Sequence, residues 1–342
     1  MESLLNNQLI VLPDLPDKMG WAGMYGGVSK NILFCMGGAN FPDGPPWDGG
    51  RKKWYDDIYL LQAGEWRMIG EKLPLPLAYG ASVSYDDKII VIGGNNHTGY
   101  FNVAFSCAWD GERMHFEDLP ALPVSLAHMA GSVVKSMVVV AGGNCYPGGA
   151  AIRKCYALDM ENISDGWFEM PDIPGEGRID PVCAIYKNEF YLFSGITFGP
   201  DDGKEKIRRA LNDGYKLSIS RLETEWSGSW KALSRMPRGV AAAGNPLPVF
   251  ENGKMLFWGG VDDESILHKD PPSHPGFSGN LLLYDAAFDT WSDREQVWDI
   301  DPRATLPVVY WNDWWIFISG EIRPGMRTNN VTGIAEIKYS LS

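Results

Sequence analysis

The stretch Ile89-Ile90-Val91-Ile92-Gly93-Gly94 has the pattern of a buried strand that ends in two glycines. Five similar stretches occur along the chain, two of them with serine in place of the first glycine: 32–38, 138–143, 191–195, 255–260 and 316–320. The first glycine or its serine replacement recurs after steps of 56, 49, 52, 65 and 60 residues. Repeats of this length that end a strand in glycines are typical of the blades of a β-propeller.

The rest of each repeat supports the same fold. A short turn such as Asp86-Asp87 precedes the glycine-ending strand, and a strand rich in small residues, as at 78–85, precedes that turn. A variable loop follows the glycines, and a later strand carries an aromatic residue such as Trp66 or Trp291. Chance recurrence in a glycine-rich sandwich does not explain why these features recur in phase. The sequence predicts an all-β fold, a six-bladed kelch-type β-propeller, with residues 1–342 as a single domain.

The two ends of the chain predict how the ring closes. The last repeat has two strands at 306–310 and 314–319 and a third at 334–339, but no fourth. A strand pattern at 8–12, followed by Pro13, supplies the missing one. We therefore expect the first and last residues to share a blade, which would leave no open sheet edge.

Composition limits the classes of partner. The chain has 30 Lys and Arg against 43 Asp and Glu, a net charge of −13. The Lys and Arg residues form no basic run, which argues against nucleic acid as a partner. The five cysteines form no Cys-x-x-Cys pair, and we expect them to be free thiols.

The chain starts without a basic region followed by an apolar core, and no apolar run approaches the ~20 residues of a membrane span. We expect a soluble, cytoplasmic protein that makes no membrane contact. A periplasmic protein whose signal peptide had been removed would look the same.

One face of the propeller is expected to carry the function. The long loops all follow the glycines and therefore share a face, which usually marks binding. The loop after the last glycine carries Glu321 and Arg327, joined through Pro324-Gly325. Three further arginines, each just before the first strand of a blade, are expected to converge on Glu321: Arg178, Arg238 and Arg303. Guanidinium groups bind carboxylates in a bidentate manner, so such a site suits an acidic small molecule.

Other chemistries have weaker support. His268 and His274 share a loop, but the sequence shows no third ligand for a metal site. The phosphate-binding glycine motifs are absent. A kelch module that binds a protein partner stays open, with aromatic loop residues as its binding hot spots: Trp47, Trp54 and Phe277.

The motif Gly320-Glu321-Ile322-Arg323-Pro324-Gly325-Met326-Arg327-Thr328 resembles the Gly-Glu-x-x-Pro-Gly-x-Arg-Thr motif of the kelch-type sialic acid mutarotases, the N-acetylneuraminate epimerases. Stretches 20–23, 37–41, 77–82 and 174–178 are also similar to that family. The likeness covers nearly all six blades, but in rotated order, as in a cyclically permuted branch. A closed ring tolerates such a permutation.

The resemblance implies a reaction and two catalytic residues. The family's glutamate and arginine fall on Glu321 and Arg327, and Arg178 also has a counterpart, whereas Arg238 and Arg303 rest on the geometric argument alone. The implied reaction interconverts the α and β anomers of N-acetylneuraminate through the open-chain form by acid and base catalysis. It requires no cofactor and no metal. An epimerase of another acidic sugar stays open, as does a homodimer.

Overall fold

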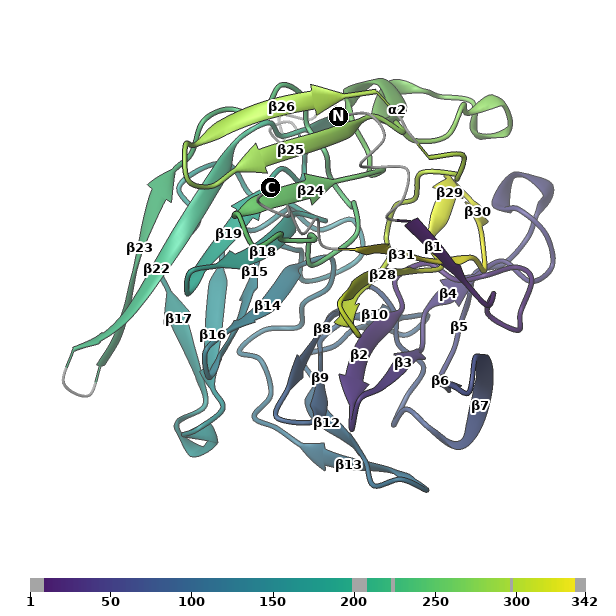
Figure 1. Ribbon diagram of the computed structural model, residues 1–342, viewed down its shortest axis with the longest axis horizontal. Helices are drawn as coiled ribbons and strands as arrows, with labels where there is room; N and C mark the ends of the chain where they lie inside the picture. The colour runs from purple at the N-terminus through teal and green to yellow at the C-terminus, as the bar shows by residue number, and fades with distance from the viewer. Residues whose placement is uncertain (1–8, 199–207, 223–224, 296–297, 336–342) are drawn as a thin grey trace, which may run out of the picture.

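The computed structural model describes residues 9–198, 208–222, 225–295 and 298–335. Six antiparallel sheets are arranged around a centre, as Figure 1 shows. Five sheets have four strands and one has three. The predicted six-bladed propeller is therefore confirmed. Within the described ranges, no helix is both long and apolar enough to cross a membrane.

The first four blades each contain four strands that follow one another in the chain. The first blade consists of β2 (Tyr25–Ser29), β3 (Ile32–Met36), β6 (Asp57–Gln62) and β7 (Glu65–Lys72), and the second of β8 (Ala81–Tyr85), β9 (Lys88–Ile92), β12 (Ala104–Trp109) and β13 (Met114–Asp118). The third consists of β14 (Ala130–Val134), β15 (Met137–Ala141), β16 (Cys155–Asp159) and β17 (Trp167–Met170), and the fourth of β18 (Val182–Tyr186), β19 (Glu189–Phe193), β22 (Gly214–Leu222) and β23 (Glu225–Ala232).

The last two blades depart from this plan. The fifth blade has three regular strands: β24 (Lys254–Phe257), β25 (Leu281–Asp285) and β26 (Thr290–Arg294). Its expected first strand is reduced to isolated pairings such as Val249 with Met255, because Pro246 and Pro248 have no N–H group for a ladder. The sixth blade consists of β27 (Val308–Trp311), β28 (Trp314–Ile318), β31 (Val331–Ala335) and β1 (Leu9–Leu12).

The sixth blade closes the ring as the sequence predicts. β1 pairs antiparallel with β31, with Leu9 opposite Ile334 and Leu12 opposite Val331. Residues 336–339 of the predicted strand lie outside the described residues. The pairing continues beyond β1, because the Leu15 amide donates to the Asn329 carbonyl at 2.9 Å. The two ends of the described chain are thus held in one sheet.

Deleting residues 1–13 should therefore lower the melting temperature by about 5–10 °C. The half-buried side chains of Leu9, Ile10 and Leu12 together contribute about 3 kcal/mol, and each kcal/mol is worth roughly 2–4 °C in a large domain. Thermal unfolding followed by circular dichroism would measure the shift. Deletion of residues 1–8, which keeps β1 whole, is the matched control. Equal melting temperatures for the two truncations would contradict the role of β1.

The hydrophobic core lies between the blades. The side chains of β9 alternate: Ile89 and Val91 pack in a cluster with the first blade, and Ile90 and Ile92 in a cluster with the third. The other four interfaces between neighbouring blades have comparable clusters. Because the middle strands are buried on both faces, they are continuously apolar, and this explains the repeated apolar run that ends in glycine.

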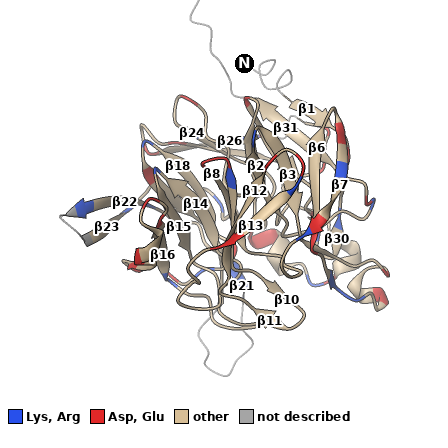
Figure 2. Ribbon diagram, turned by 90° about the horizontal axis from the view of Figure 1, so that it is seen from below, with Lys and Arg blue, Asp and Glu red and all other residues tan. Residues whose placement is uncertain are grey.

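The loops after the glycines project from one face, as the sequence predicts. Four of them form short hairpins, and β10, β11 and β21 lie together at the lower side of Figure 2. The hairpins are β4 (Ala39–Asn40) with β5 (Lys53–Trp54), β10 (Asn95–Asn96) with β11 (Gly99–Tyr100), β20 (Ile196–Phe198) with β21 (Arg208–Ala210), and β29 (Glu321–Arg323) with β30 (Met326–Arg327). The helical segments are short: α2 (Asp263–Leu267) and the 3-10 turns η1 (Pro46–Asp48), η2 (Ile163–Asp165) and η3 (Pro271–Ser273).

Candidate active site

The hairpin of β29 and β30 brings Glu321 and Arg327 together. The two residues face each other in the strand register, and Pro324-Gly325 forms the turn between the strands. Arg327 Nη2 lies 2.6 Å from Glu321 Oε1. The Arg327 side chain is 3% exposed and that of Glu321 is 18% exposed. The contact between these two residues is therefore as the sequence predicts, and the pair is largely removed from water.

Several charges act on the Glu321 carboxyl group. Burial raises its pKa above the ordinary glutamate value, and this effect outweighs the opposing effect of Arg327. Lys52 and His128 also lower the pKa, whereas the Asp180 charge raises it. Residues from four different blades thus influence one carboxyl group. A carboxylate with a raised pKa is a stronger base, which suits it to accept a proton.

Arg327 has hydrogen-bonding capacity left over. Its guanidinium lies over the Phe41 ring, with the carbon 4.6 Å from the ring centroid. Its Nε and Nη1 atoms are buried and have no hydrogen-bond partner among the described residues. Buried donors without a partner are costly and rare in proteins. Arg327 therefore has donors available for a ligand oxygen beside Glu321.

A closed ring of backbone hydrogen bonds surrounds the central channel. One residue of each blade, just before the first strand, donates its N–H to the carbonyl of the equivalent residue in the preceding blade, at 2.7 to 2.9 Å. All six residues have a left-handed φ between 49° and 64°. In order around the ring they are Gly23, Tyr79, His128, Asp180, Ala242 and Thr305. These residues fix the start of every channel strand by main-chain bonds alone.

The ring side chains lie near Glu321. All six ring residues line a channel cavity of about 70 Å³. Glu321 is close to the ring without lining the cavity itself: its N–H donates at 2.8 Å to the carbonyl of Ala304, the residue before Thr305. Ligand pockets commonly measure roughly 300–1,000 Å³. The cavity therefore has room for only part of a small-molecule ligand.

Three polar or aromatic ring residues contact one another. His128 Nδ1 lies 2.9 Å from Asp180 Oδ1, and the His128 ring stacks on Tyr79 with centroids 5.0 Å apart. Lys52 Nζ donates to the Tyr79 hydroxyl at 3.2 Å. The sequence interpretation missed these four residues. A signal was present, because the position before the first strand holds a large or polar side chain in three consecutive blades.

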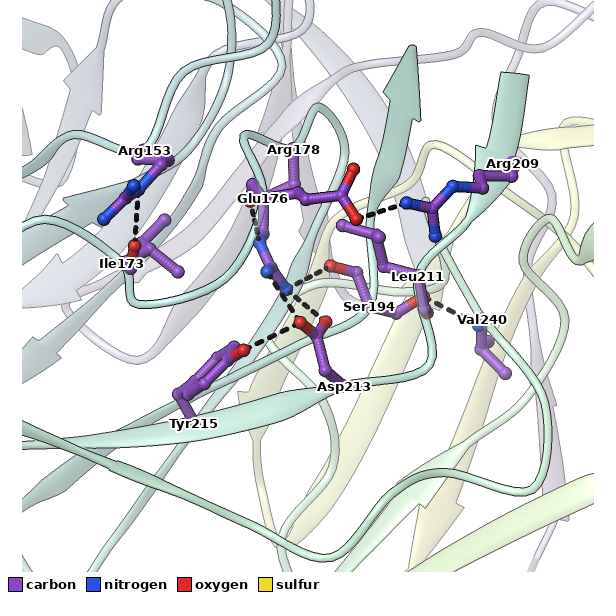
Figure 3. Close-up of polar contacts among 10 residues, drawn as sticks. All are labelled: Arg153, Ile173, Glu176, Arg178, Ser194, Arg209, Leu211, Asp213, Tyr215 and Val240. Carbon is purple, nitrogen blue, oxygen red and sulfur yellow. Dashed lines mark hydrogen bonds and ion pairs between the residues drawn. The ribbon is translucent and has the colours of Figure 1, made fainter. Parts of the chain in front are cut away.

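Arg178 does not reach this site, and the expected convergence of three more arginines on Glu321 is wrong. Figure 3 shows Arg178 pointing to Asp213, with Nη1 2.9 Å from Oδ1. Its Nη1 also donates to the Ser194 carbonyl at 3.0 Å, and the side chain is fully buried. Burial acts to raise the pKa of Asp213, but hydrogen bonds from Arg178 and Tyr215 lower it overall. Arg178 therefore stabilises its own blade.

Arg303 has the equivalent place in the sixth blade. Its Nη1 donates to the Ser319 carbonyl at 3.2 Å and to the Asn330 carbonyl at 2.7 Å. Burial lowers the pKa of Arg303 to about 10, so the group remains protonated at neutral pH. In both blades the arginine precedes by 16 residues the serine that replaces the first glycine. The hydrogen bond from the arginine to the carbonyl of that serine is thus a structural feature shared by two blades.

Arg238 does not have an equivalent place. Val240 holds that position in the fifth blade, because its N–H donates to Ser194 Oγ at 2.8 Å and it precedes Ala241, which bridges to Val261. Arg238 Nη2 donates to the Asn280 carbonyl at 2.9 Å, and its Nη1 lies 3.9 Å from Asp262 Oδ2. Its contacts therefore tie together loops of the fifth blade.

Replacing Arg178 with methionine should destabilise the protein by about 3–5 kcal/mol, because removal of one partner leaves the other as an uncompensated charge. Arg209, in the same blade, pairs with Glu176 where both side chains are half-exposed. Arg209→Met is the matched control and should cost at most about 1 kcal/mol. Urea unfolding gives both free energies of unfolding. Equal losses in the two variants would contradict the assignment of Arg178.

The remaining candidates also have defined places. His274 is buried, with Nε2 3.1 Å from the Ser265 carbonyl and Nδ1 accepting from the Gly276 amide. Phe277 is buried against Ala242 and Ala304, and the Trp54 indole donates to Asn95 Oδ1 at 3.0 Å. These rings are used within the fold, which disfavours them as hot spots for a partner. All five cysteines, each in a described range, are free thiols.

Comparison with known proteins places this site in context. Residues 6–116 match the family model described as N-acetylneuraminate epimerase. Over 105 residues the chain is 42% identical to the N-acetylneuraminate epimerase of Salmonella arizonae and 40% identical to that of Salmonella enteritidis. Over 110 residues it is 37% identical to that of Yersinia enterocolitica. Over this part of its length the chain is similar to the N-acetylneuraminate epimerases.

The epimerase match covers 28% of this chain and 27% of the length of the two Salmonella relatives. The family-model match at 6–116 includes Phe41, Lys52 and Tyr79 but ends before His128, Glu321 and Arg327. The motif at 320–328, which resembles that of the epimerases, therefore lies outside the matched residues. A solved structure titled "Structure of YjhT" superposes on 96% of this chain and 98% of its own, with a TM-score of 0.68 and 15% identity, which supports the fold.

Proposed function

We propose that this protein is a mutarotase that interconverts the α and β anomers of N-acetylneuraminate through the open-chain form. The observation that carries the proposal is the buried Glu321–Arg327 pair beside the channel cavity. The names of the relatives supply the sugar. The roles in proton transfer and in sugar binding are assigned to side chains whose charge and position suit them.

Glu321 removes the proton of the anomeric hydroxyl. As that proton leaves, the bond between the anomeric carbon and the ring oxygen breaks, the anomeric oxygen becomes a keto group, and the ring oxygen takes a proton. Closure on the other face of the keto group reverses these transfers and gives the other anomer. The raised pKa of Glu321 strengthens it as a base. No proton is gained or lost overall.

Arg327 binds the sugar's carboxylate. Its Nε and Nη1 are donors without a partner among the described residues, and guanidinium groups favour planar carboxylates. Lys52, which lies within 6 Å of the Tyr79 and Trp54 rings, adds positive charge at the same place. The site thus opposes an acidic sugar with two cations, although the whole chain is acidic.

We further propose that the chain is a cyclic permutation of its relatives. The sequence match stops at residue 116, whereas the superposition on a solved structure covers 96% of the chain. A change in blade order would break a linear sequence match while leaving the ring intact.

Proton NMR of freshly released α-N-acetylneuraminate tests the function. We expect catalytic amounts of the protein to bring the anomeric ratio to equilibrium much faster than buffer or heat-denatured protein does. The equilibrium ratio itself should not change. Identical relaxation with and without the protein would overturn the proposal. If the protein accelerates anomer exchange only of another acidic ketose, the proposed reaction would stand and the proposed substrate would be wrong.

A further inference from the structure

The reaction needs a second proton-transfer group, and the channel ring places one opposite Glu321. His128 and Thr305 are separated by three hydrogen-bonded steps in either direction around the ring of six. Glu321 bonds to Ala304, next to Thr305. His128 and Glu321 therefore come from opposite blades and act across the same channel, in agreement with the influence of the His128 charge on Glu321.

The surroundings of His128 hold its ring in one orientation. Nδ1 contacts Asp180 Oδ1 at 2.9 Å, Tyr79 stacks on one side, and Tyr100 lies with its ring centroid 6.1 Å away. The His128 side chain in this pair is 20% exposed. The carboxylate occupies Nδ1 and leaves Nε2 as the ring nitrogen outside the ion pair.

The Nε2 atom of His128 has only a long contact with the rest of the protein. It lies 3.4 Å from Asn95 Nδ2, which is long for a hydrogen bond. The Asn95 amide is oriented by the Trp54 indole, which donates to Asn95 Oδ1 at 3.0 Å. Because an amide N–H₂ group faces Nε2, a proton on Nε2 has no acceptor there. An oxygen atom of a ligand at Nε2 would supply that acceptor.

We propose that His128 is a second catalytic residue, which gives a proton to the ring oxygen of the sugar through Nε2 while Glu321 takes one from the anomeric hydroxyl. Asp180 and Tyr79 are positioning residues. During ring opening the imidazolium becomes imidazole and the carboxylate becomes a carboxylic acid. During closure the new hydroxyl returns its proton to His128 as its oxygen attacks the keto carbon, and Glu321 returns its proton to the keto oxygen. This inference rests on the proposed mutarotase function.

The test compares three variants with the parent protein between pH 5 and 9, with NMR exchange rates of the anomers as the readout. His128→Asn keeps a residue that tolerates the left-handed φ of 61°. We expect it to lower kcat by about 10²-fold and to remove the decline in rate at high pH that loss of the imidazolium causes. Sugar binding, measured by ligand-observed NMR, should change less than threefold. The groups around His128 that can also titrate are Asp180, Tyr79, Tyr100, Lys52 and Glu321.

Asp180→Asn is the second variant, and it keeps the shape of the positioning residue. Without the carboxylate Nδ1 loses its partner and the His128 ring is held less firmly, so kcat should fall about tenfold while sugar binding changes less than threefold. The matched control is His115→Asn, which alters an exposed His–Asp pair with a 2.6 Å contact to Asp110 on the outer strand of the second blade. It should leave rate and pH profile unchanged.

The outcomes separate this inference from the proposed function. A parent protein without activity would overturn the mutarotase proposal and this one with it. An active parent protein whose His128→Asn variant keeps the parental rate and pH profile would overturn only the role of His128. A variant that loses rate and binding in proportion would also overturn it, because His128 would then be a binding residue. If His128→Asn does not fold, Asp180→Asn decides, and a parental kcat in that variant counts against the proposal.

Discussion

The Glu321→Gln variant should interconvert the anomers about 10²–10⁴-fold more slowly than the parent protein, which is the range that a positioned general base supplies. Glutamine keeps the shape and the hydrogen-bonding capacity of the side chain but does not accept the proton. Sugar binding should therefore stay largely intact. Because the sugar also interconverts spontaneously, the measured rate should approach that of the sugar alone. NMR relaxation of the α anomer gives the rate.

The pH dependence provides an independent check of Glu321. The active form of the base is the carboxylate, so activity should fall as the pH drops through the pKa of Glu321. Burial raises that pKa. The acidic decline should consequently occur above the ordinary glutamate value of about 4.3, and it should disappear in Glu321→Gln. Glu176→Gln, which alters an exposed glutamate paired with Arg209, is the control and should keep the parental rate and profile.

Replacing Arg327 with lysine should weaken sugar binding by about 10–100-fold and lower the rate as well. Lysine keeps the charge but loses the planar arrangement of donors that matches a carboxylate. Charge-assisted hydrogen bonds contribute about 1.5–3 kcal/mol each, which corresponds to this range. The contact of Arg327 with the Phe41 ring would be altered at the same time. Titration followed by ligand-observed NMR gives the dissociation constant.

The methyl ester of the sugar separates charge pairing from other effects of the Arg327 variant. The ester has lost the negative charge but keeps the anomeric hydroxyl. The parent protein should bind it about as weakly as Arg327→Lys binds the free acid, and the variant should discriminate little between the two ligands. If the parent protein binds acid and ester equally well, Arg327 does not hold the carboxylate.

The fold could be predicted from the sequence because each blade contains its own apolar strand pattern. Apolar strands such as 89–92 are buried on both faces, so their pattern is independent of what lies farther along the chain. The pairing of β1 with β31 could be predicted for the same reason, since one strand was missing from the last repeat. The irregular start of the fifth blade was not predicted, although Pro246 and Pro248 contained the signal.

The site was predicted only where its residues are close in sequence. Glu321 and Arg327 belong to one hairpin, whereas Lys52, Tyr79 and His128 come from other blades and meet only in the closed ring. The error over Arg178 and Arg303 has a physical cause. A guanidinium points into the protein interior where buried hydrogen-bond acceptors are present. Here the acceptors are the Asp213 carboxylate and backbone carbonyl groups, whose positions cannot be derived from the sequence alone.

The ring of six hydrogen bonds separates architecture from chemistry. Only main-chain atoms make it, so the side chains at its six positions can be exchanged without removing a bond, and the present set already ranges from glycine to tyrosine. Each blade contributes one exchangeable side chain to the common site at the channel. The left-handed backbone restricts the choice most severely for branched side chains, of which Thr305 is the one example in the ring. A new specificity could therefore be acquired one blade at a time, while the other five keep their places.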